Sequence, residues 1–450
     1  MTTFEQGWIK GSIIRNLLLL SWPIIILNGL YGVSLTIEMI WVGKLGQAAI
    51  AGLGIASVVE MLVMSITMGI CTGSRALIAR FIGAGDVRSA NHVGGQSFVI
   101  SFAFSAFIAV IGIFFAEPII GLFGVEAVVI AEGAAYLRIV LVGWVTMSFW
   151  MNVFGNMQAS GDTVTPMKIA IFIRIIHAII CPFLVLGWWV FPRMGVGGAA
   201  TANVAYQGLG CFIGLWMFFS RRTNLQLVSR DFCIDLNIVW RILKIGIPAS
   251  IMGIQSAFSN ILLAWFMAPF GTLAVAAHGM VSRIQQWVLM TGGGLARGGG
   301  ILVGQNMGAG SPERAETSGW LAAAATGIWS VACLLIVLLW SENIIRIFNT
   351  EPDLVKLGGI FLRIAAVGFL AVVFVHVMQQ CITGAGDTLP VMLISVVMLW
   401  VVLLPLALFL PEVVGLGVYG VRWAIVISMF VGALGYALYF RLGRWKLKKV

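Results

Sequence analysis

Charged side chains are scarce in this chain of 450 residues. It has 27 Lys and Arg and 17 Asp and Glu, and charged residues make up only 10% of the sequence, against about 25% in a soluble domain. Hydrophobic residues make up 60% of it. This composition excludes an ordinary soluble domain and predicts a polytopic membrane protein.

Motifs for metal binding and for catalysis are also missing. None of the six cysteines belongs to a CxxC pair, so the sequence predicts neither a metal site nor a disulfide framework. The chain contains neither GxSxG nor HExxH, which leaves a membrane enzyme without a recognisable catalytic centre. We therefore expect no enzyme activity, and no cofactor other than a coupling ion.

Apolar segments long enough to cross a hydrocarbon core of about 30 Å recur along the whole chain. We predict twelve membrane helices. They span residues 17–43, 48–72, 93–116, 127–155, 166–190, 195–219, 242–268, 274–303, 318–340, 354–381, 388–410 and 415–440. The first segment is too long for a cleavable signal peptide, so we expect it to remain as a helix.

The positive charges are distributed unevenly between the loops. Most Lys and Arg lie near the termini and in the even-numbered loops, whereas the odd-numbered loops have only Lys44, Arg193, Arg346 and Lys356. This asymmetry predicts a multi-pass protein of the cell (inner) membrane with both termini cytoplasmic. Topology then accounts for the net charge of +10, and no nucleic-acid partner is expected.

The chain contains an internal repeat with a fixed offset of 225 residues. The offset relates Pro23 to Pro248 and Arg138 to Arg363, and it holds from about residue 23 to residue 163. The copied phrases include FIGAGDVRSA against NMGAGSPERA, and ASGDT against GAGDT. Six helices per copy give both copies the same orientation in the membrane. The predicted fold is therefore an all-α integral membrane protein with two six-helix lobes related by a parallel repeat.

The repeat also predicts the domain organisation. We expect an N-terminal lobe at residues 1–220, a polar cytoplasmic linker at 221–241 and a C-terminal lobe at 242–450. The shared GAG and GDT turns have a structural interpretation, since Gly permits a positive φ and Asp can cap the next helix. Two lobes facing each other across a central cleft would suit alternating access.

Acidic residues are almost absent from the predicted spans, which contain only Glu38, Glu60 and Glu132. A charge at the bilayer centre costs at least roughly 2.5–3.5 kcal/mol, and protonation of the carboxylate relieves that cost. The residues Asn28, Tyr31, Ser34 and Glu38 share one helix face. We interpret Glu38 as a proton carrier; the alternative is a buried acid satisfied by a neighbouring Arg or Tyr. Glu60 lacks such a stripe and is interpreted as structural.

The second copy of the repeat keeps this stripe without its carboxylate. Its counterparts are Gly253, Ser256, Ser259 and Leu263, so chemistry that requires protonation is predicted only for the first half. The abundant Trp, Phe and Met indicate an apolar cleft that could bind hydrophobic cations through aromatic faces. The candidate cleft residues are Asn28, Tyr31, Ser34, Gln255, Ser256 and Ser259.

Several segments resemble the multidrug and toxic compound extrusion (MATE) transporters, particularly their prokaryotic branch. These segments are IEMIWVGKLG, APFGTLAVAAHGMVSRIQ, ILVGQNMGAGSPERA and QASGDTVTPM, and the likeness covers nearly the whole chain. The resemblance implies twelve helices in two lobes. It also implies efflux of organic, often cationic compounds in exchange for protons or sodium ions.

The resemblance also implies a set of cation-coupling residues. The family's first-helix Asp corresponds to Glu38, and its fifth-helix Asn and Asp correspond to His177 and Cys181, which precedes a proline. Its sixth-helix Thr corresponds to Asn203. A hard cation prefers several oxygen ligands, and His and Cys remove two of them, whereas His titrates near neutral pH. These departures favour proton coupling through Glu38, with His177 as its partner; alone, an intramembrane His is more often structural.

The predicted function is secondary-active export of hydrophobic organic cations by proton antiport. The alternatives within the same superfamily are a sodium-coupled exporter and a lipid-linked flippase, and a channel is the alternative from another class. The expected partners are small organic cations and the lipid bilayer, and we expect a monomer.

Overall fold

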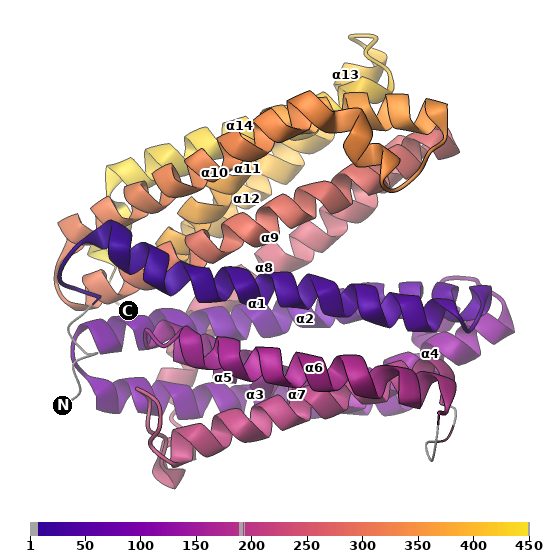
Figure 1. Cartoon of the computed structure of the whole chain (residues 1–450). Helices are drawn as coiled ribbons and strands as arrows, with labels where there is room; N and C mark the ends of the chain where they lie inside the picture. Colours follow the sequence, from indigo (N-terminus) through magenta and orange to yellow (C-terminus); the bar gives the residue numbers. More distant parts are fainter. Residues whose placement is uncertain (1–7, 189–191, 193, 449–450) are drawn as a thin grey trace. The chain divides into compact units, whose positions relative to one another are not determined.

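The computed structural model describes residues 8–188, 192 and 194–448, apart from the side chains of residues 33–39. Within this part the chain forms helices joined by short loops and no strand (Figure 1). The elements are α1 (Ile13–Gly43), α2 (Gln47–Gly83), α3 (Val87–Gly121), α4 (Ala127–Val142), α5 (Trp144–Ala159), α6 (Val164–Leu186), α7 (Gly195–Phe219), η1 (Ser229–Phe232), α8 (Leu236–Met267), η2 (Ala268–Phe270), α9 (Thr272–Gly308), α10 (Pro312–Arg346), α11 (Pro352–Gly384), α12 (Thr388–Val396), the π-helix η3 (Val397–Leu403), α13 (Leu404–Glu412), α14 (Val418–Leu442) and η4 (Arg444–Leu447).

The predicted all-α membrane fold is confirmed. Ten of the described helices are long and apolar enough to cross a bilayer, and α4 with α5, bent by 51° where they join, makes an eleventh span. Helix α9, which contains the remaining predicted span, has 37 residues and is long enough to cross, but its run GGGLARGGG lowers its mean hydropathy. Each of the twelve predicted spans therefore overlaps a helix or a consecutive group of helices.

Two of the predicted spans are interrupted, and neither interruption was predicted. The span at 127–155 bends at Gly143, between α4 and α5. The span at 388–410 contains the π-helix η3, which is followed by Pro405 in the first turn of α13. Proline lacks an N–H and its ring clashes with the carbonyl four residues earlier, which explains why the helix widens before it.

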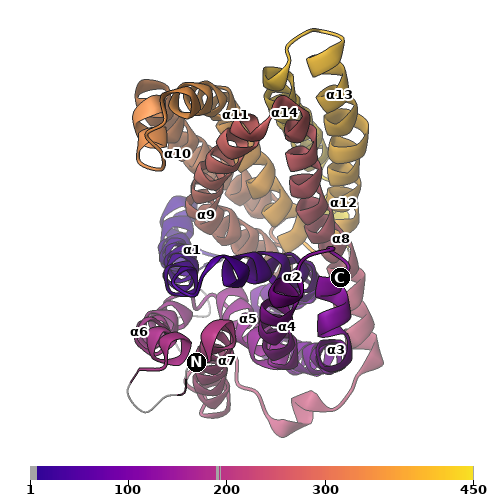
Figure 2. The ribbon, with the colours of Figure 1, turned by 90° about the vertical axis from the view of Figure 1, so that its right-hand side faces the viewer.

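Contacts divide the chain into two units. The N-unit is Ile26–Ser250, and the C-unit is formed by residues up to Ile25 together with Ile251 onward. In the N-unit, α2, α3 and α4 pack on one another and α6 packs on α7, as Figure 2 shows in a view along these helices. In the C-unit, α11 packs against α9, α10 and α14.

The boundaries between the units lie within α1 and within α8, and they are 225 residues apart like the repeat itself. The first half of α1 belongs to the C-unit, where Leu17 and Leu20 are buried in a core with α9 residues. The first half of α8 belongs to the N-unit, where Ile242 approaches Gly73 of α2 so closely that a Cβ there would clash. The predicted domain boundaries at 220 and 242, which follow the sequence repeat, stay a prediction.

The repeat is visible in the geometry of each unit. Left-handed glycines occur at matching positions in both copies, with φ of 77° at Gly85 and 70° at Gly310, and of 92° at Gly161 and 87° at Gly386. Arg138 is paired with Glu117 at 2.8 Å in the N-unit, and their counterparts Arg363 and Glu342 are paired at 3.2 Å in the C-unit.

The predicted capping role of the aspartates is confirmed for two of the turns. Asp86 Oδ1 accepts a hydrogen bond from the Ser89 backbone N–H, and Asp162 Oδ1 accepts one from Thr165, both at 3.0 Å. Asp387 makes no such cap. Its carboxylate instead accepts a hydrogen bond from Tyr439 and pairs with Lys448 at 3.2 Å.

Candidate functional site

A polar cluster lies where α1, α6 and α7 of the N-unit meet. The Arg174 guanidinium of α6 lies 5.5 Å from the ring centroid of Tyr31 on α1 and 4.7 Å from that of Tyr206 on α7. The Tyr206 ring also packs on His177, with 4.6 Å between centroids. Such cation–π contacts fix a permanent positive charge near the middle of α6.

His177 is the most unusual member of this cluster. Its side chain is buried, and neither ring nitrogen has a hydrogen-bond partner in the described part of the chain. Buried polar groups are nearly always paired, because an unpaired one costs about 1–3 kcal/mol. The imidazole therefore has the capacity to exchange a proton or to hold a ligand that supplies the missing partner.

The other predicted coupling residues lie on the same helices. Cys181 is buried one turn after His177 on α6, because residues four apart share a helix face. Asn203 on α7 and Asn28 on α1 are half-buried. Glu38 and Ser34 belong to α1, but their side chains lie outside the described residues. The structure therefore places His177 directly against Tyr206, and places Arg174 against both Tyr206 and Tyr31. The place of the Glu38 carboxyl stays a prediction.

Sequence reasoning missed Arg174 and Tyr206. An Arg in the middle of an apolar span is itself a signal, because intramembrane charges usually face a bundle interior or an aqueous cavity. Tyr206 carried no comparable signal, because its position beside His177 depends on the packing of α6 against α7.

The C-unit contains an uncharged polar cluster. Gln255 of α8, a predicted cleft residue, donates to the Ser395 carbonyl at 2.5 Å, next to the π-helix η3. The Ser395 hydroxyl contacts Tyr436 at 2.7 Å, and Gln379 donates to Tyr436 at 3.0 Å. The neighbouring cleft candidates Ser256 and Ser259 are exposed and half-buried, respectively. Sequence reasoning missed the other three members of this cluster.

A second buried network lies in the N-unit between α3 and α5. Asn152 donates to the Ser101 hydroxyl at 2.6 Å, and Asn156 donates to Ser97 at 3.1 Å. Ser105 and Ser148 contact each other at 2.7 Å. These side chains are fully or almost fully buried, so the network holds the two helices in one register.

Glu60 has a different environment from the cluster around His177. The Tyr136 hydroxyl lies 3.5 Å from Glu60 Oε2, which links α4 to α2. Glu60 is half-buried and Tyr136 is buried. A contact between neighbouring helices of one unit fits the structural role predicted for Glu60.

Comparison with known proteins identifies the family. The sequence profile of the MatE family matches residues 23–183 and 248–409. The two matches begin at Pro23 and Pro248, so each covers one copy of the repeat. The chain belongs to the MatE family. The resemblance to MATE transporters noted in the sequence is thereby confirmed.

Relatives and solved structures are similar to this MatE protein over nearly its whole length. The probable multidrug resistance protein YoeA of Bacillus subtilis is 28% identical over 98% of this chain and 96% of its own. An FAD transporter of Shewanella oneidensis is 23% identical over 90% of this chain and 89% of its own. A MOP superfamily transporter from Pyrococcus furiosus, described by the words "reverse polarity of binding pocket", shares the fold with a TM-score of 0.92 and 22% identity over 100% of both chains.

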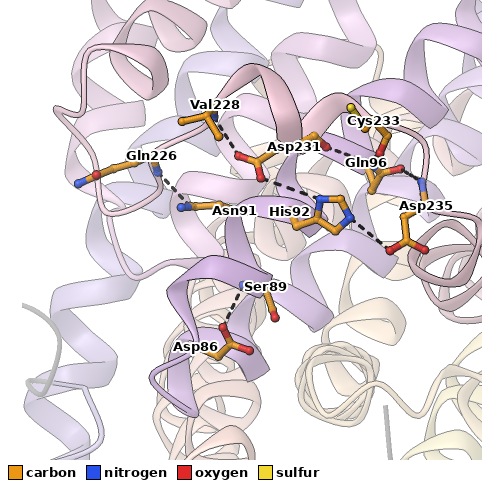
Figure 3. Close-up of polar contacts among 10 residues, drawn as sticks. All are labelled: Asp86, Ser89, Asn91, His92, Gln96, Gln226, Val228, Asp231, Cys233 and Asp235. Carbon is orange, nitrogen blue, oxygen red and sulfur yellow. Dashed lines mark hydrogen bonds and ion pairs between the residues drawn. The ribbon is translucent and has the colours of Figure 1, made fainter.

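The linker of this MatE protein is held against the end of α3 (Figure 3). Gln96 donates to the carbonyls of Asp231 and Cys233 at 2.8 and 2.7 Å and accepts from the Asp235 N–H at 3.0 Å. His92 lies between two carboxylates, 3.3 Å from Asp235 and 3.9 Å from Asp231. Residues 226–235 of the linker are therefore fixed to the N-unit, and we call this segment the linker strap.

Backbone N–H groups in this segment lower the pKa of Asp235. The N–H of Ile238, the N–H of Asn237 and the nearby His92 hold the pKa of Asp235 below its usual value. Asp235 is therefore ionised at neutral pH, where it can cap α8 and attract His92 at the same time.

Proposed function

We propose that this MatE protein is a secondary-active multidrug exporter that moves hydrophobic organic cations out of the cell in exchange for protons by alternating access. The observation that carries the proposal is the N-unit cluster around His177, the buried imidazole whose two nitrogens have no partner among the described residues. It lies on the helix face where the family resemblance assigns cation coupling. The C-unit cluster at Gln255 is uncharged.

The coupling ion we propose is the proton rather than sodium. A permanent guanidinium at Arg174 repels a second bound cation by about 2 kcal/mol if the charges are roughly 8 Å apart at an effective dielectric constant of about 20. Cys181 and His177 also supply no hard oxygen ligand. A carboxyl at Glu38 needs no such ligands, because protonation alone removes its charge.

The orientation we propose follows the positive-inside rule. We assign both termini and the linker strap to the cytoplasmic side of the cell membrane, because Lys and Arg are concentrated in these parts of the chain. A reporter enzyme fused after residue 450 should be active only in the cytoplasm. Activity of that fusion outside the membrane would reverse the assignment.

Arg174 supports a second candidate, export of compounds that carry an anionic group. Guanidinium and aromatic faces together are suited to phosphate or carboxylate groups on a planar molecule. The name of the Shewanella relative, an FAD transporter, describes a compound of this kind.

The test is transport by the purified protein in proteoliposomes. Export of an ethidium-like dye and of a flavin dinucleotide is measured under an imposed pH gradient, and again under a sodium gradient of equal size. We expect dye export with the pH gradient alone. Export of the dinucleotide but not the dye would favour the second candidate, and transport driven only by sodium would refute proton coupling.

A further inference from the structure

Arg422, near the start of α14, is a buried guanidinium without a carboxylate partner among the residues that the structure describes. Its residue is only 2% exposed. One terminal nitrogen, Nη1, lies 3.3 Å from Nδ1 of His278 on α9, and the guanidinium carbon lies 5.2 Å from the ring centroid of Phe361 on α11. The remaining nitrogens, Nε and Nη2, are buried with no hydrogen-bond partner in the described part of the chain.

This arrangement leaves a charge uncompensated. Arg stays protonated in proteins, and a buried charge without a counter-charge costs several kcal/mol or more. Of the two helices that contact Arg422, α9 carries the basic residues Arg283 and Arg297 and no acid, and α11 carries Asp353 as well as Lys356 and Arg363. Glu342 of α10 is already paired with Arg363 at 3.2 Å and with Arg346 at 4.0 Å. No ion pair of Arg422 occurs among the described residues.

The geometry of the free nitrogens defines what could pair with them. Nε and Nη2 lie on the same edge of the planar guanidinium, so their N–H groups point in parallel. This edge is the fork that holds an anion with two hydrogen bonds. The opposite side is occupied by His278. Because Arg can only donate, Nδ1 of His278 accepts, and the proton of the neutral ring is assigned to Nε2.

The surroundings restrict the size of the anion. The side chains packed here include Ala277, Val281, Phe361 and Val421, which belong to one apolar core. Because Nε and Nη2 are closed off from the surface, an organic substrate or a phosphate ester cannot reach them without opening that core. A single negative charge suffices to neutralise the guanidinium.

We infer that the Nε–Nη2 edge of Arg422 binds a small monovalent inorganic anion of the chloride class inside the C-unit. The anion completes the hydrogen bonding of Arg422 and neutralises its charge. It thereby stabilises the contact of α14 with α9 and α11. This site is separate from the N-unit cluster, and its role does not depend on which compound is exported.

The first experiment measures thermal unfolding of the purified full-length protein in detergent. Chloride or bromide is compared with gluconate, a large anion, at equal ionic strength. The wild type should gain several degrees in Tm with chloride or bromide, and the gain should saturate because it reports binding. Arg422→Gln should lose this dependence, whereas Arg363→Gln, which removes an exposed arginine two residues from Phe361, should keep it.

The second experiment needs no variant and covers the case in which Arg422→Gln fails to fold. Crystals of the wild type grown in bromide should give an anomalous peak within hydrogen-bond distance of both Nε and Nη2. A water molecule in that place, or equal stabilisation by gluconate and chloride, would overturn the inference. So would a folded Arg422→Gln protein with unchanged anion dependence.

Discussion

The two units descend from one repeat, yet their interiors differ in kind. Counting 225 residues onward, Asn152 and Asn156 of the N-unit become Val377 and Cys381. Arg174 and His177 lie beyond residue 163, where this offset ends, so they are not compared by it. At these two positions the N-unit buries amides, while the C-unit buries apolar side chains. The buried guanidinium of the C-unit, Arg422, lies elsewhere, on α14. The comparison teaches that the two copies share the turns and ion pairs that preserve the fold, whereas each unit has its own set of buried polar groups.

The largest effect is expected at Glu38, whose counterpart is Leu263. Glu38→Gln imitates the permanently protonated carboxyl and should abolish proton-driven dye export in proteoliposomes, since a coupling acid must alternate between two states. Glu38→Asp should keep part of the activity, and Glu60→Gln most of it. Export by Glu38→Gln at the wild-type rate would remove the main functional distinction between the two units.

Arg174→Leu, which replaces the cation of the N-unit cluster by an apolar residue, should change the charge preference of the site. Loss of the guanidinium should tighten binding of an organic cation about tenfold, equivalent to about 1.4 kcal/mol, and weaken binding of an anionic compound. Competition for dye export measures both affinities. Arg174→Lys, which keeps the charge, is the control; a change equal for cations and anions would contradict an electrostatic role.

Asn152→Val should make the interior of the N-unit resemble that of the C-unit at a cost in stability. The substitution removes the partner of Ser101 and should lower the free energy of unfolding by about 1–3 kcal/mol. The reverse change, Val377→Asn, should also destabilise, because a buried amide would lack partners there. Denaturant or thermal unfolding in detergent tests both. An unchanged midpoint for Asn152→Val would show that the network adds no stability.

Gln96→Leu, again the residue of the other copy, should loosen the linker strap. Three hydrogen bonds to Asp231, Cys233 and Asp235 are lost, so hydrogen exchange across residues 226–235 should accelerate. Arg88→Gln, at an exposed position of the same helix end, is the control. Exchange that stays as slow as in the wild type would mean that other contacts hold the strap.

The smallest effect is expected at Asp86, whose counterpart Ser311 makes no side-chain cap. Hydrogen bonds from the Ser89 side chain and backbone hold the pKa of Asp86 below its ordinary value of 3.8. Asp86→Ala should cost about 1 kcal/mol at neutral pH, and Ser311→Ala close to nothing. Because the folded pKa is depressed, the stabilisation exists above the unfolded pKa and is lost as the pH falls through the folded one. If the unfolding midpoints of the wild type and Asp86→Ala differ by the same amount at pH 7 and at pH 3, this prediction is contradicted.

Sequence alone predicted the fold well because its signals can be read directly from residue types and their spacing. Spans follow from runs of apolar residues, and the repeat follows from glycines and prolines at a fixed offset. The bend at Gly143 and the π-helix before Pro405 escaped prediction because the composition is continuous across both. At the candidate site, His177 was singled out through the family resemblance, because an intramembrane His alone is more often structural.

The contacts of the site could not be predicted in the same way. Tyr206 reaches His177 because α6 packs on α7, and Gln255 reaches Ser395 from a helix far away in sequence. Such distances depend on tertiary packing. The role of Glu38, whose side chain lies outside the described residues, still rests on the sequence and on the family resemblance.

The half-helices before Ile25 and before Ser250 have a consequence for the origin of the molecule. Each belongs to the unit built mainly from the other copy, so neither copy of the repeat contains all of its own core. A gene encoding a single copy would have produced a chain whose first half-helix does not pack on its own unit. That unit would also have lacked the half-helix that completes its core. Two such chains could have completed each other by exchanging these segments, which is domain swapping, and fusion of the genes would then have made the exchange permanent.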